Sequence, residues 1–457
     1  MDERRLRRLG RGECALPGGN AVGGRTVTDG WRPSGALLRA ALPSVAFTLA
    51  AVVAGRPDVI VLVTPLLVFA AAAAVRRPSL VPRAGNRLLH PAIREGEGTV
   101  VRTVIENSGD VEHAVVRMTP HRWLVWRPPV GVAGATAAAP VTKLALDVPV
   151  ASTRWGRRPA GDGLVSATSA WAGFRWGPEP LLSQTLTTLP LPGRFDTRAP
   201  TPHPIGLVGV HPARRVGAGT ELAEIRPFSV GDRLRRVQWP VSLRTGTLHV
   251  TSTVAEEDSS ILLVVDSGVD IGVGGGIGES ASSLDVAVRA AGAIAEHYLH
   301  RGDRVGLRVL GTTRHNFAPT AAGRRHLRRI LDTLARIVPG ENRDAAPSRV
   351  QFGLPAGTVV LVLSPMLSEQ AVAATLTLAR RGLSVVAIDT LPDDVHLADD
   401  DPRVRLAWRM RLLERDAVLR KARAAGVPVV AWRGPGTLDE VLRKLGRRAS
   451  MPRMVRR

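Results

Sequence analysis

Hydrophobic residues near the start of the chain form two long runs without a charge. They occupy residues 40–54 and 59–75, and a turn of four residues separates them. Each run comes close to the about 20 apolar residues that a helix needs to cross a bilayer. The pattern predicts a transmembrane helical hairpin over residues 36–76. A buried helical hairpin in a soluble protein is the alternative interpretation.

The pattern then changes to short stretches in which apolar and polar residues alternate. Examples are residues 99–107, 113–119 and 143–150, with turn residues between them. This spacing is typical of antiparallel strands and predicts a β-sandwich-like domain over residues 85–195. Five tryptophans fall in this region: Trp123, Trp126, Trp155, Trp171 and Trp176. They either fill the sandwich core or its membrane-facing end, or line a binding surface.

A third pattern covers residues 259–450, after a connector over residues 196–258 that begins with a basic, Gly- and Pro-punctuated stretch. Near-continuous Val, Leu and Ile runs predict strands at 261–266, 304–311, 358–364, 384–390 and 427–432. Amphipathic stretches predict helices at 282–301, 324–338, 369–382, 403–425 and 437–447. Strands buried on both faces and separated by helices are typical of a doubly wound, mostly parallel sheet. The expected fold is therefore α/β, preceded by the hairpin and the sandwich, and ligands of such sheets bind at the carboxyl ends of the strands.

Composition and charge indicate the compartment of the soluble part and the orientation of the hairpin in the membrane. The chain of 457 residues has 62 Lys and Arg against 40 Asp and Glu, and almost all the cations are Arg, so this uniform bias is not by itself a nucleic-acid footprint. Cys14 has no second cysteine to pair with, which is consistent with a reducing compartment. Arginines in the basic, flexible leader (1–35) and just after the hairpin predict that both termini of a two-span plasma-membrane protein lie in the cytoplasm.

Two carboxylates follow the first strand of the expected sheet. The order of this sheet and its acidic loop resemble the von Willebrand factor A domain, whose metal-ion-dependent adhesion site uses Asp-x-Ser-x-Ser, a Thr and a further Asp. Here the first loop gives Asp266, Gly268 and Asp270, Ser364 stands where the last acid is expected, and Thr320 is the nearest Thr. The resemblance implies a degenerate site. Asp266 and Asp270 hold Mg²⁺ in one interpretation; in the other, which expects no cofactor, Asp266 caps the following turn.

A second resemblance is carried by residues 219–250, "GTELAEIRPFSVGDRLRRVQWPVSLRTGTLHV". This stretch is similar to the signature of the bacterial membrane-protein family called domain of unknown function fifty-eight. The matching positions are Gly219, Glu221, Arg226, Phe228, Gly231, Asp232, Arg235, Val237, Trp239, Ser242 and Arg244. Gln238 departs from the pattern. Residues 155–178 also resemble the family's actinobacterial form, and the likeness extends from about residue 36 onward.

The family resemblance implies a partner rather than a reaction. Its members are commonly associated with MoxR-type AAA+ ATPases, which implies a chaperone-like, assembly or envelope-related role. The expected partner-binding residues are Glu221, Arg226, Gly231, Asp232, Arg235, Trp239, Ser242 and Arg244. The alternative is that their charges only fasten the connector to the next domain. No catalytic constellation can be assembled, so an enzyme is not expected.

Two weaker motifs are also present. Gly276-x-Gly278-x-x-Ala281 has the spacing of a dinucleotide fingerprint, but it begins ten residues after Asp266, which predicts a flexible loop instead. Arginines at 324, 325, 328 and 329 form a basic helix face. No nucleic-acid reading motif accompanies this charge, so membrane lipid, an acidic protein or plain solvent is the expected counterpart.

Overall fold

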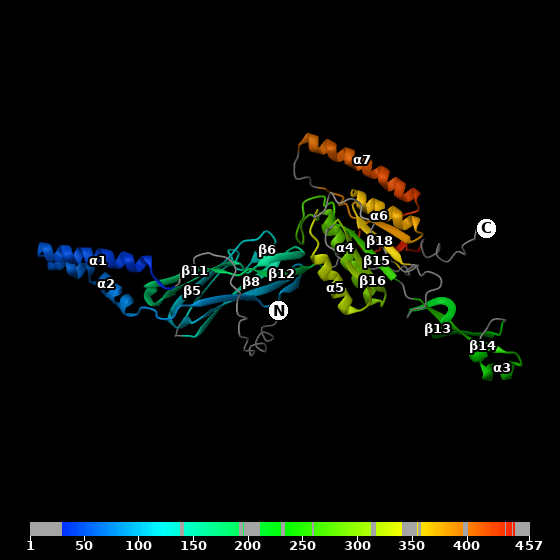
Figure 1. The fold of residues 1–457 in the computed structure, drawn as a ribbon, viewed down its shortest axis with the longest axis horizontal. Coiled ribbons are helices and arrows are strands. Elements are labelled where there is room, and N and C mark those ends of the chain that lie inside the picture. Colours follow the sequence, from blue (N-terminus) through cyan, green and yellow to red (C-terminus); the bar gives the residue numbers. More distant parts are fainter. Residues whose placement is uncertain are drawn as a thin grey trace.

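The structure of the chain is a computed structural model (Figure 1). It describes residues 30–137, 141–191, 195, 211–229, 234–257, 260–311, 317–340, 354, 358–395, 401–434, 436–440 and 442–443. Figure 1 shows an elongated molecule in which a helical hairpin, a β-sheet domain, an α/β domain and a projecting β-ribbon follow one another.

The two N-terminal apolar runs form helices α1 (Gly35–Ala54) and α2 (Pro57–Val75), which pack against each other as a hairpin. The Ser34 side chain caps α1, and Gly55 takes the left-handed conformation (φ 59°) that ends it. Most leucine and valine side chains of both helices are exposed. Both helices are long and apolar enough to cross a membrane.

Strands between residues 83 and 189, together with the short strand at 32–33, form the sandwich. One sheet has the order β1-β11-β10-β5-β7, a second β2-β4-β8-β6 and a third β3-β12-β9. The first sheet contains β1 (Arg32–Pro33), β5 (Val111–Met118), β7 (Val132–Thr136), β10 (Gly163–Ser169) and β11 (Phe174–Leu181). The second contains β2 (Arg83–Leu88), β4 (Gly98–Glu106), β6 (Leu124–Trp126) and β8 (Lys143–Ser152), and the third β3 (Ala92–Arg94), β9 (Gly156–Ala160) and β12 (Gln184–Leu189). Short 3₁₀ turns lie at η2 (Ser108–Asp110) and η3 (Ala170–Ala172).

Alternation along these strands builds one core between the sheets. Val101 and Val148 from the second sheet meet Val116 and Val165 from the first in the same buried cluster. Trp126 and Trp176 also belong to this core, as one of the two interpretations of the tryptophans predicts.

The α/β domain has a six-stranded sheet in the order β17-β16-β15-β18-β19-β20. Its strands are β15 (Ser260–Asp266), β16 (Arg304–Leu310), β17 (Phe317–Ala321), β18 (Val359–Ser364), β19 (Ser384–Asp389) and β20 (Val429–Ala431). Helices α4 (Ser283–His300) and α5 (Arg324–Ala335) bury apolar side chains on one face, and α6 (Glu369–Arg380) and α7 (Pro402–Ala424) on the other. All strands are parallel except the edge strand β17.

The expected strands and helices of this domain match the structure closely, with two differences. Strand β17 was not expected, because "FAPTA" has no clear alternation and contains a proline. The predicted helix at 437–447 lies partly outside the described residues; positions 439–440 and 442–443 are helical.

Candidate functional site

The stretch that resembles the family signature, residues 219–250, lies on a ribbon that leaves the body of the α/β domain. Strand β13 (His211–Pro227) pairs with β14 (His249–Glu257), and η4 (Leu234–Arg236) and α3 (Trp239–Thr245) lie at the far end (Figure 1). The seven-residue helix α3 ends at Gly246, whose φ of 70° suits glycine. We call residues 234–245 the knob.

The knob presents large apolar side chains to solvent. Leu234 is 71% exposed, Trp239 61% and Leu243 81%. Trp239 and Leu243 are four residues apart on α3, so they share one face of the helix. Exposed apolar side chains that share a face, as Trp239 and Leu243 do, can mark a binding site.

Some polar residues of the signature hold the knob together, and others are exposed to solvent. Ser242 is buried: its Oγ donates to Gln238 O (2.9 Å) and accepts from His249 N (2.8 Å), which fixes α3 on β14. Arg235 and Arg244 are exposed and have no ion pair with any residue that the structure describes. The signature therefore holds both a structural anchor and accessible cations.

Other predicted positions are described only in part. Arg226 is half-buried and donates to Pro227 O (3.1 Å). Gly231 and Asp232 lie outside the described residues, and so does the side chain of Glu221. The signature resemblance predicted Trp239 as a binding residue but not Leu234 and Leu243. Two leucines within an Arg-rich connector could have indicated an exposed apolar surface.

The carboxylate at the end of the central strand is closed off from solvent. Asp266 is 1% exposed; its Oδ1 accepts from Gly268 N (3.1 Å) and its Oδ2 from Ser364 Oγ (2.8 Å). Burial raises the pKa of Asp266 to about 6, although these hydrogen bonds oppose the shift. The predicted capping of the following turn by Asp266 is confirmed by the bond from Gly268.

Asp270 accepts hydrogen bonds from the first residues of α4. Its Oδ1 accepts from Leu284 N (3.0 Å) and Ser283 Oγ (3.3 Å). Thr320 lies in β17, next to Gly306 near the start of β16, so it is not brought to the carboxyl edge where Asp266 lies; its place as the Thr of the resemblance is wrong.

The carboxylate oxygens at this edge are engaged in hydrogen bonds with the protein. Mg²⁺ requires a near-octahedral shell of oxygens that converge on one point. Both oxygens of Asp266 already accept protein hydrogen bonds, and one oxygen of Asp270 accepts two. Within the described ranges, no group of three or more His, Cys, Asp or Glu residues could hold a metal ion.

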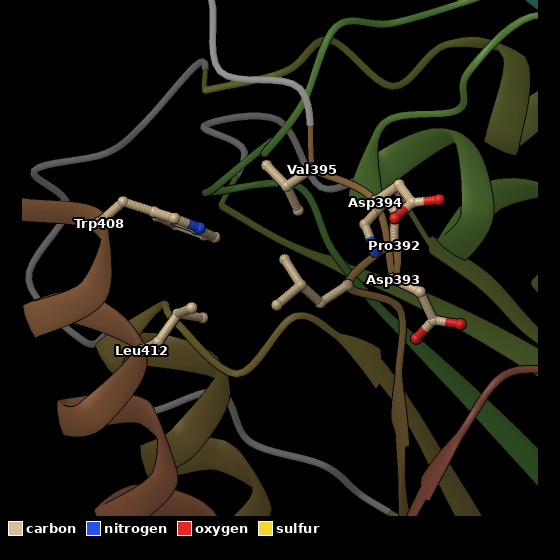
Figure 2. Close-up of a pocket in the computed structure, with 7 residues that line it drawn as sticks. Pro392, Asp393, Asp394, Val395, Trp408 and Leu412 are labelled. Atoms are coloured by element: carbon tan, nitrogen blue, oxygen red, sulfur yellow. The ribbon is translucent and has the colours of Figure 1, made fainter. Parts of the chain in front are cut away.

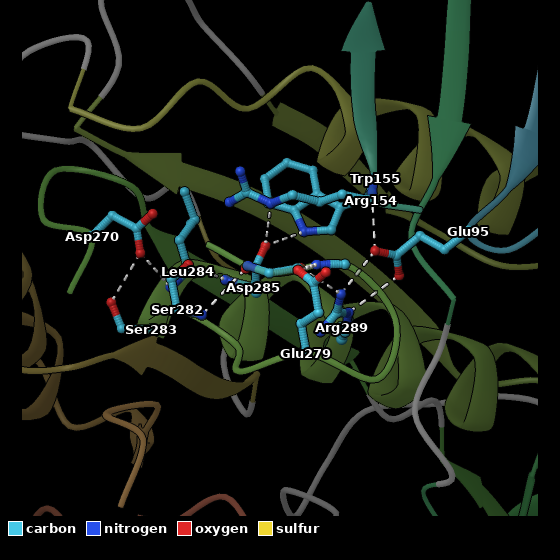
Figure 3. A network of polar contacts seen from close by, with 12 residues as sticks. Glu95, Arg154, Trp155, Asp270, Glu279, Ser282, Ser283, Leu284, Asp285 and Arg289 are labelled. Atoms are coloured by element: carbon cyan, nitrogen blue, oxygen red, sulfur yellow. Dashed lines mark hydrogen bonds and ion pairs between the residues drawn. The ribbon is translucent and has the colours of Figure 1, made fainter. Parts of the chain in front are cut away.

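A third carboxylate, Asp285, joins the α/β domain to the sandwich (Figure 3). Its Oδ1 accepts from Arg154 Nε (2.9 Å) and Trp155 Nε1 (2.8 Å), and its Oδ2 from Gly275 N and Ser282 N (both 3.2 Å). It also completes the capping box with Ser282 at the start of α4. We call Asp266, Asp270 and Asp285 the acidic edge.

Glu95 of the sandwich makes the reciprocal ion pair. It accepts from Arg289 Nη2 (3.0 Å) and Nε (3.2 Å) of α4, and from the backbone N–H groups of Trp155 and Leu191 (both 2.9 Å). Burial lowers the pKa of Arg289, but the bonds to Glu95 outweigh it and leave that pKa raised. Two buried carboxylates with full sets of donors therefore fasten the two domains together.

The Gly-rich loop after β15 belongs to this junction. Ile277 N donates to Thr153 O (2.9 Å) of the sandwich, and Gly276 N to Glu279 Oε2 (3.0 Å). Because α4 begins only at Ser283, the loop does not form a strand-to-helix phosphate turn. The glycines instead allow close approach to the sandwich, since a Cβ on Gly276 would lie 3.0 Å from Thr153 Cβ.

A cavity of about 540 Å³ lies between the loop after β19 and helix α7 (Figure 2). Val395 faces Trp408 and Leu412 across it, and the carboxylates of Asp393 and Asp394 point away from Trp408. The α7 side of the cavity, formed by Trp408 and Leu412, therefore places no acid, base or nucleophile opposite these carboxylates.

Comparisons with known proteins agree with the signature. Residues 224–404 match the family described as protein of unknown function DUF58. This match begins on the ribbon and runs to the first turn of α7. The chain is also similar to uncharacterized protein Mb1516 of Mycobacterium bovis and uncharacterized protein Rv1480 of Mycobacterium tuberculosis, with 33% identity over 129 residues in each case. That stretch is 28% of this chain, and it spans 40% of the length of each relative.

Proposed function

We propose that this chain is a membrane-anchored interaction or assembly factor that docks another protein through its knob. One observation carries the proposal: the signature segment lies at the tip of a projecting ribbon, where Leu234, Trp239 and Leu243 are exposed. Trp and Arg are the residues most often found to dominate binding energy at protein interfaces. A knob with an exposed Trp between Arg235 and Arg244 has this composition.

The resemblance supplies the kind of partner. Members of the family are commonly associated with MoxR-type AAA+ ATPases, so we propose such an ATPase as the partner in a chaperone-like or envelope-related role. The sheet order with one antiparallel edge strand supports a von Willebrand A-like interpretation of residues 259–450. In this proposal the protein acts by binding and not by catalysis, and it neither needs a cofactor nor binds nucleic acid specifically.

Two further features support the proposed location. Helices α1 and α2 leave most of their apolar surface uncovered, as a bilayer-spanning hairpin would. Arginines precede and follow the hairpin, which favours cytoplasmic termini. The sandwich, the α/β domain and the knob would then extend from the inner face of the plasma membrane into the cytoplasm.

Direct binding tests the proposal. The full-length chain in mild detergent is titrated with the purified MoxR-type ATPase of the same cells, as wild type and as Trp239→Ala and Leu243→Ser. We expect each knob variant to weaken binding at least about 30-fold, as loss of an interface hot spot does. The matched control is Leu413→Ser, which also replaces an exposed helical leucine, on α7. No binding by wild type, or equal loss with the control, would refute the proposal.

A further inference from the structure

The end of the sandwich that faces the hairpin is packed directly on the ends of the two apolar helices. Ser34 N, just before α1, donates to Gly173 O (2.9 Å). Leu37, Ala73 and Phe174 form a small buried cluster across the same joint. A Cβ on Gly173 would lie 2.7 Å from Ala73 Cβ, so glycine lets α2 approach this closely. Side chains at this end are therefore held at a fixed height relative to any bilayer that the hairpin crosses.

Two arginines lie opposite each other at this joint. Arg32 of β1 is the cross-strand partner of Arg175 of β11, and both are exposed. Like charges directly opposite on neighbouring strands destabilise a sheet. Neither guanidinium has an ion-pair partner among the described residues.

A second pair of opposed arginines in the sandwich has a carboxylate partner. Arg87 and Arg102 are cross-strand partners on β2 and β4, but Asp147 lies opposite Arg102 on the next strand. It accepts from Arg102 Nε (2.8 Å) and Nη2 (2.7 Å). Asp147 supplies the anion there, whereas neither arginine of the pair beside the hairpin forms an ion pair with a carboxylate that the structure describes.

A strained tryptophan accompanies the unpaired cations. Trp171 has φ 60°, an unusual conformation for a bulky residue, and it is 52% exposed. Its backbone N–H donates to Glu112 Oε2 (2.7 Å), and the Arg76 guanidinium, just after α2, lies 6.0 Å from its ring centroid. Tryptophan is enriched at the headgroup level of membranes, where one side of the ring is apolar and the other wet.

We propose that this neck, formed by Arg32, Arg76, Trp171 and Arg175, binds the phosphate headgroup of anionic phospholipids. The phosphate lies between Arg32 and Arg175, where planar guanidinium groups can each donate two hydrogen bonds. Trp171 and Arg76 lie in the same interfacial layer. The inference rests on the proposed membrane anchoring and adds the lipid class, and charge complementarity at the inner leaflet supports it.

Native mass spectrometry of the full-length chain tests the lipid class. The protein is released from mild detergent doped with equal amounts of phosphatidylglycerol and phosphatidylcholine, and retained lipids are counted. We expect wild type to retain phosphatidylglycerol preferentially and the Arg32→Gln/Arg175→Gln double variant to lose about tenfold of that preference. The control, Arg117→Gln/Arg127→Gln, makes the same change in charge at exposed sandwich positions outside the neck and should keep it.

Equal retention of the two lipids by wild type would overturn the inference, and so would an equal loss in the control. An alkaline wash of cell membranes separates this result from failure of the anchor. A chain that stays in the membrane but shows no lipid preference refutes only the lipid inference. A chain that the wash releases refutes the anchoring and the inference together.

Discussion

The acidic edge and the knob use similar residues in opposite ways. At the edge, Trp155 is buried and its indole N–H donates to Asp285, which also accepts from Arg154. At the knob, Trp239 is mostly exposed and Arg235 has no ion pair among the described residues. Tryptophan and arginine thus bind a buried acid that joins two domains in one place, and are exposed to solvent in the other.

The difference shows that residue type alone does not mark a binding site. The carboxylates of the acidic edge already accept hydrogen bonds from protein donors, so a ligand that took over these oxygens would have to displace those donors. A ligand at the knob would only displace water from apolar side chains. The acidic edge is therefore expected to respond to mutation through stability, and the knob through binding.

The largest expected effect is at Asp285. Asp285→Asn removes a buried charge that pairs with Arg154 and should lower the free energy of unfolding by about 3–5 kcal/mol. Urea unfolding of the detergent-solubilised chain measures it. Asp147→Asn removes the exposed partner of Arg102 and should cost less than about 1 kcal/mol. Equal costs for the two variants would contradict the structural role of the edge.

Asp266 should make stability depend on pH. Burial raises its pKa from 3.8 to about 6, so the folded state holds a proton that the unfolded state has lost between these values. Stability therefore falls as pH rises through about 4 to 6, by up to about 3 kcal/mol, and the loss is complete above that window. Asp266→Asn should remove this dependence. The measurement is the difference in unfolding free energy between the variant and wild type, which should change between pH 4.5 and pH 7.5. A constant difference across that range would rule out a raised pKa.

A matched pair of tryptophan replacements compares the two regions directly. Trp155→Phe removes the donor to Asp285 and leaves a buried carboxylate oxygen with one partner fewer, which should cost about 1–3 kcal/mol. Trp239→Phe changes an exposed ring and should stay within about 0.5 kcal/mol of wild type. Thermal unfolding of both variants side by side is the measurement. A larger cost at Trp239 would mean that the knob is held against another part of the chain.

Local patterns predicted elements well and long-range pairings poorly. Continuous apolar runs predicted β15, β16, β18, β19 and β20, because strands buried on both faces are apolar throughout. The bond between Trp155 and Asp285 joins positions 130 residues apart, and nothing in either segment's pattern encodes it. The position of Asp270 was ambiguous in the sequence, because an acid shortly after a strand is also typical of a metal-binding loop. In the structure its carboxylate accepts a hydrogen bond from the start of α4.

Added magnesium should have the smallest effect of all. A site with a dissociation constant of 10 µM would stabilise the folded chain by about 2.7 kcal/mol at about 1 mM Mg²⁺, since the ion would bind only the folded state. We expect no shift in Tm at constant ionic strength, because Asp266 and Asp270 are engaged with Ser364 and Leu284. A saturable rise in Tm that Asp266→Asn abolishes would show that the edge opens for a cation. In that case the von Willebrand A-type metal hypothesis, and not the knob, would become the leading account of how this protein binds its partner.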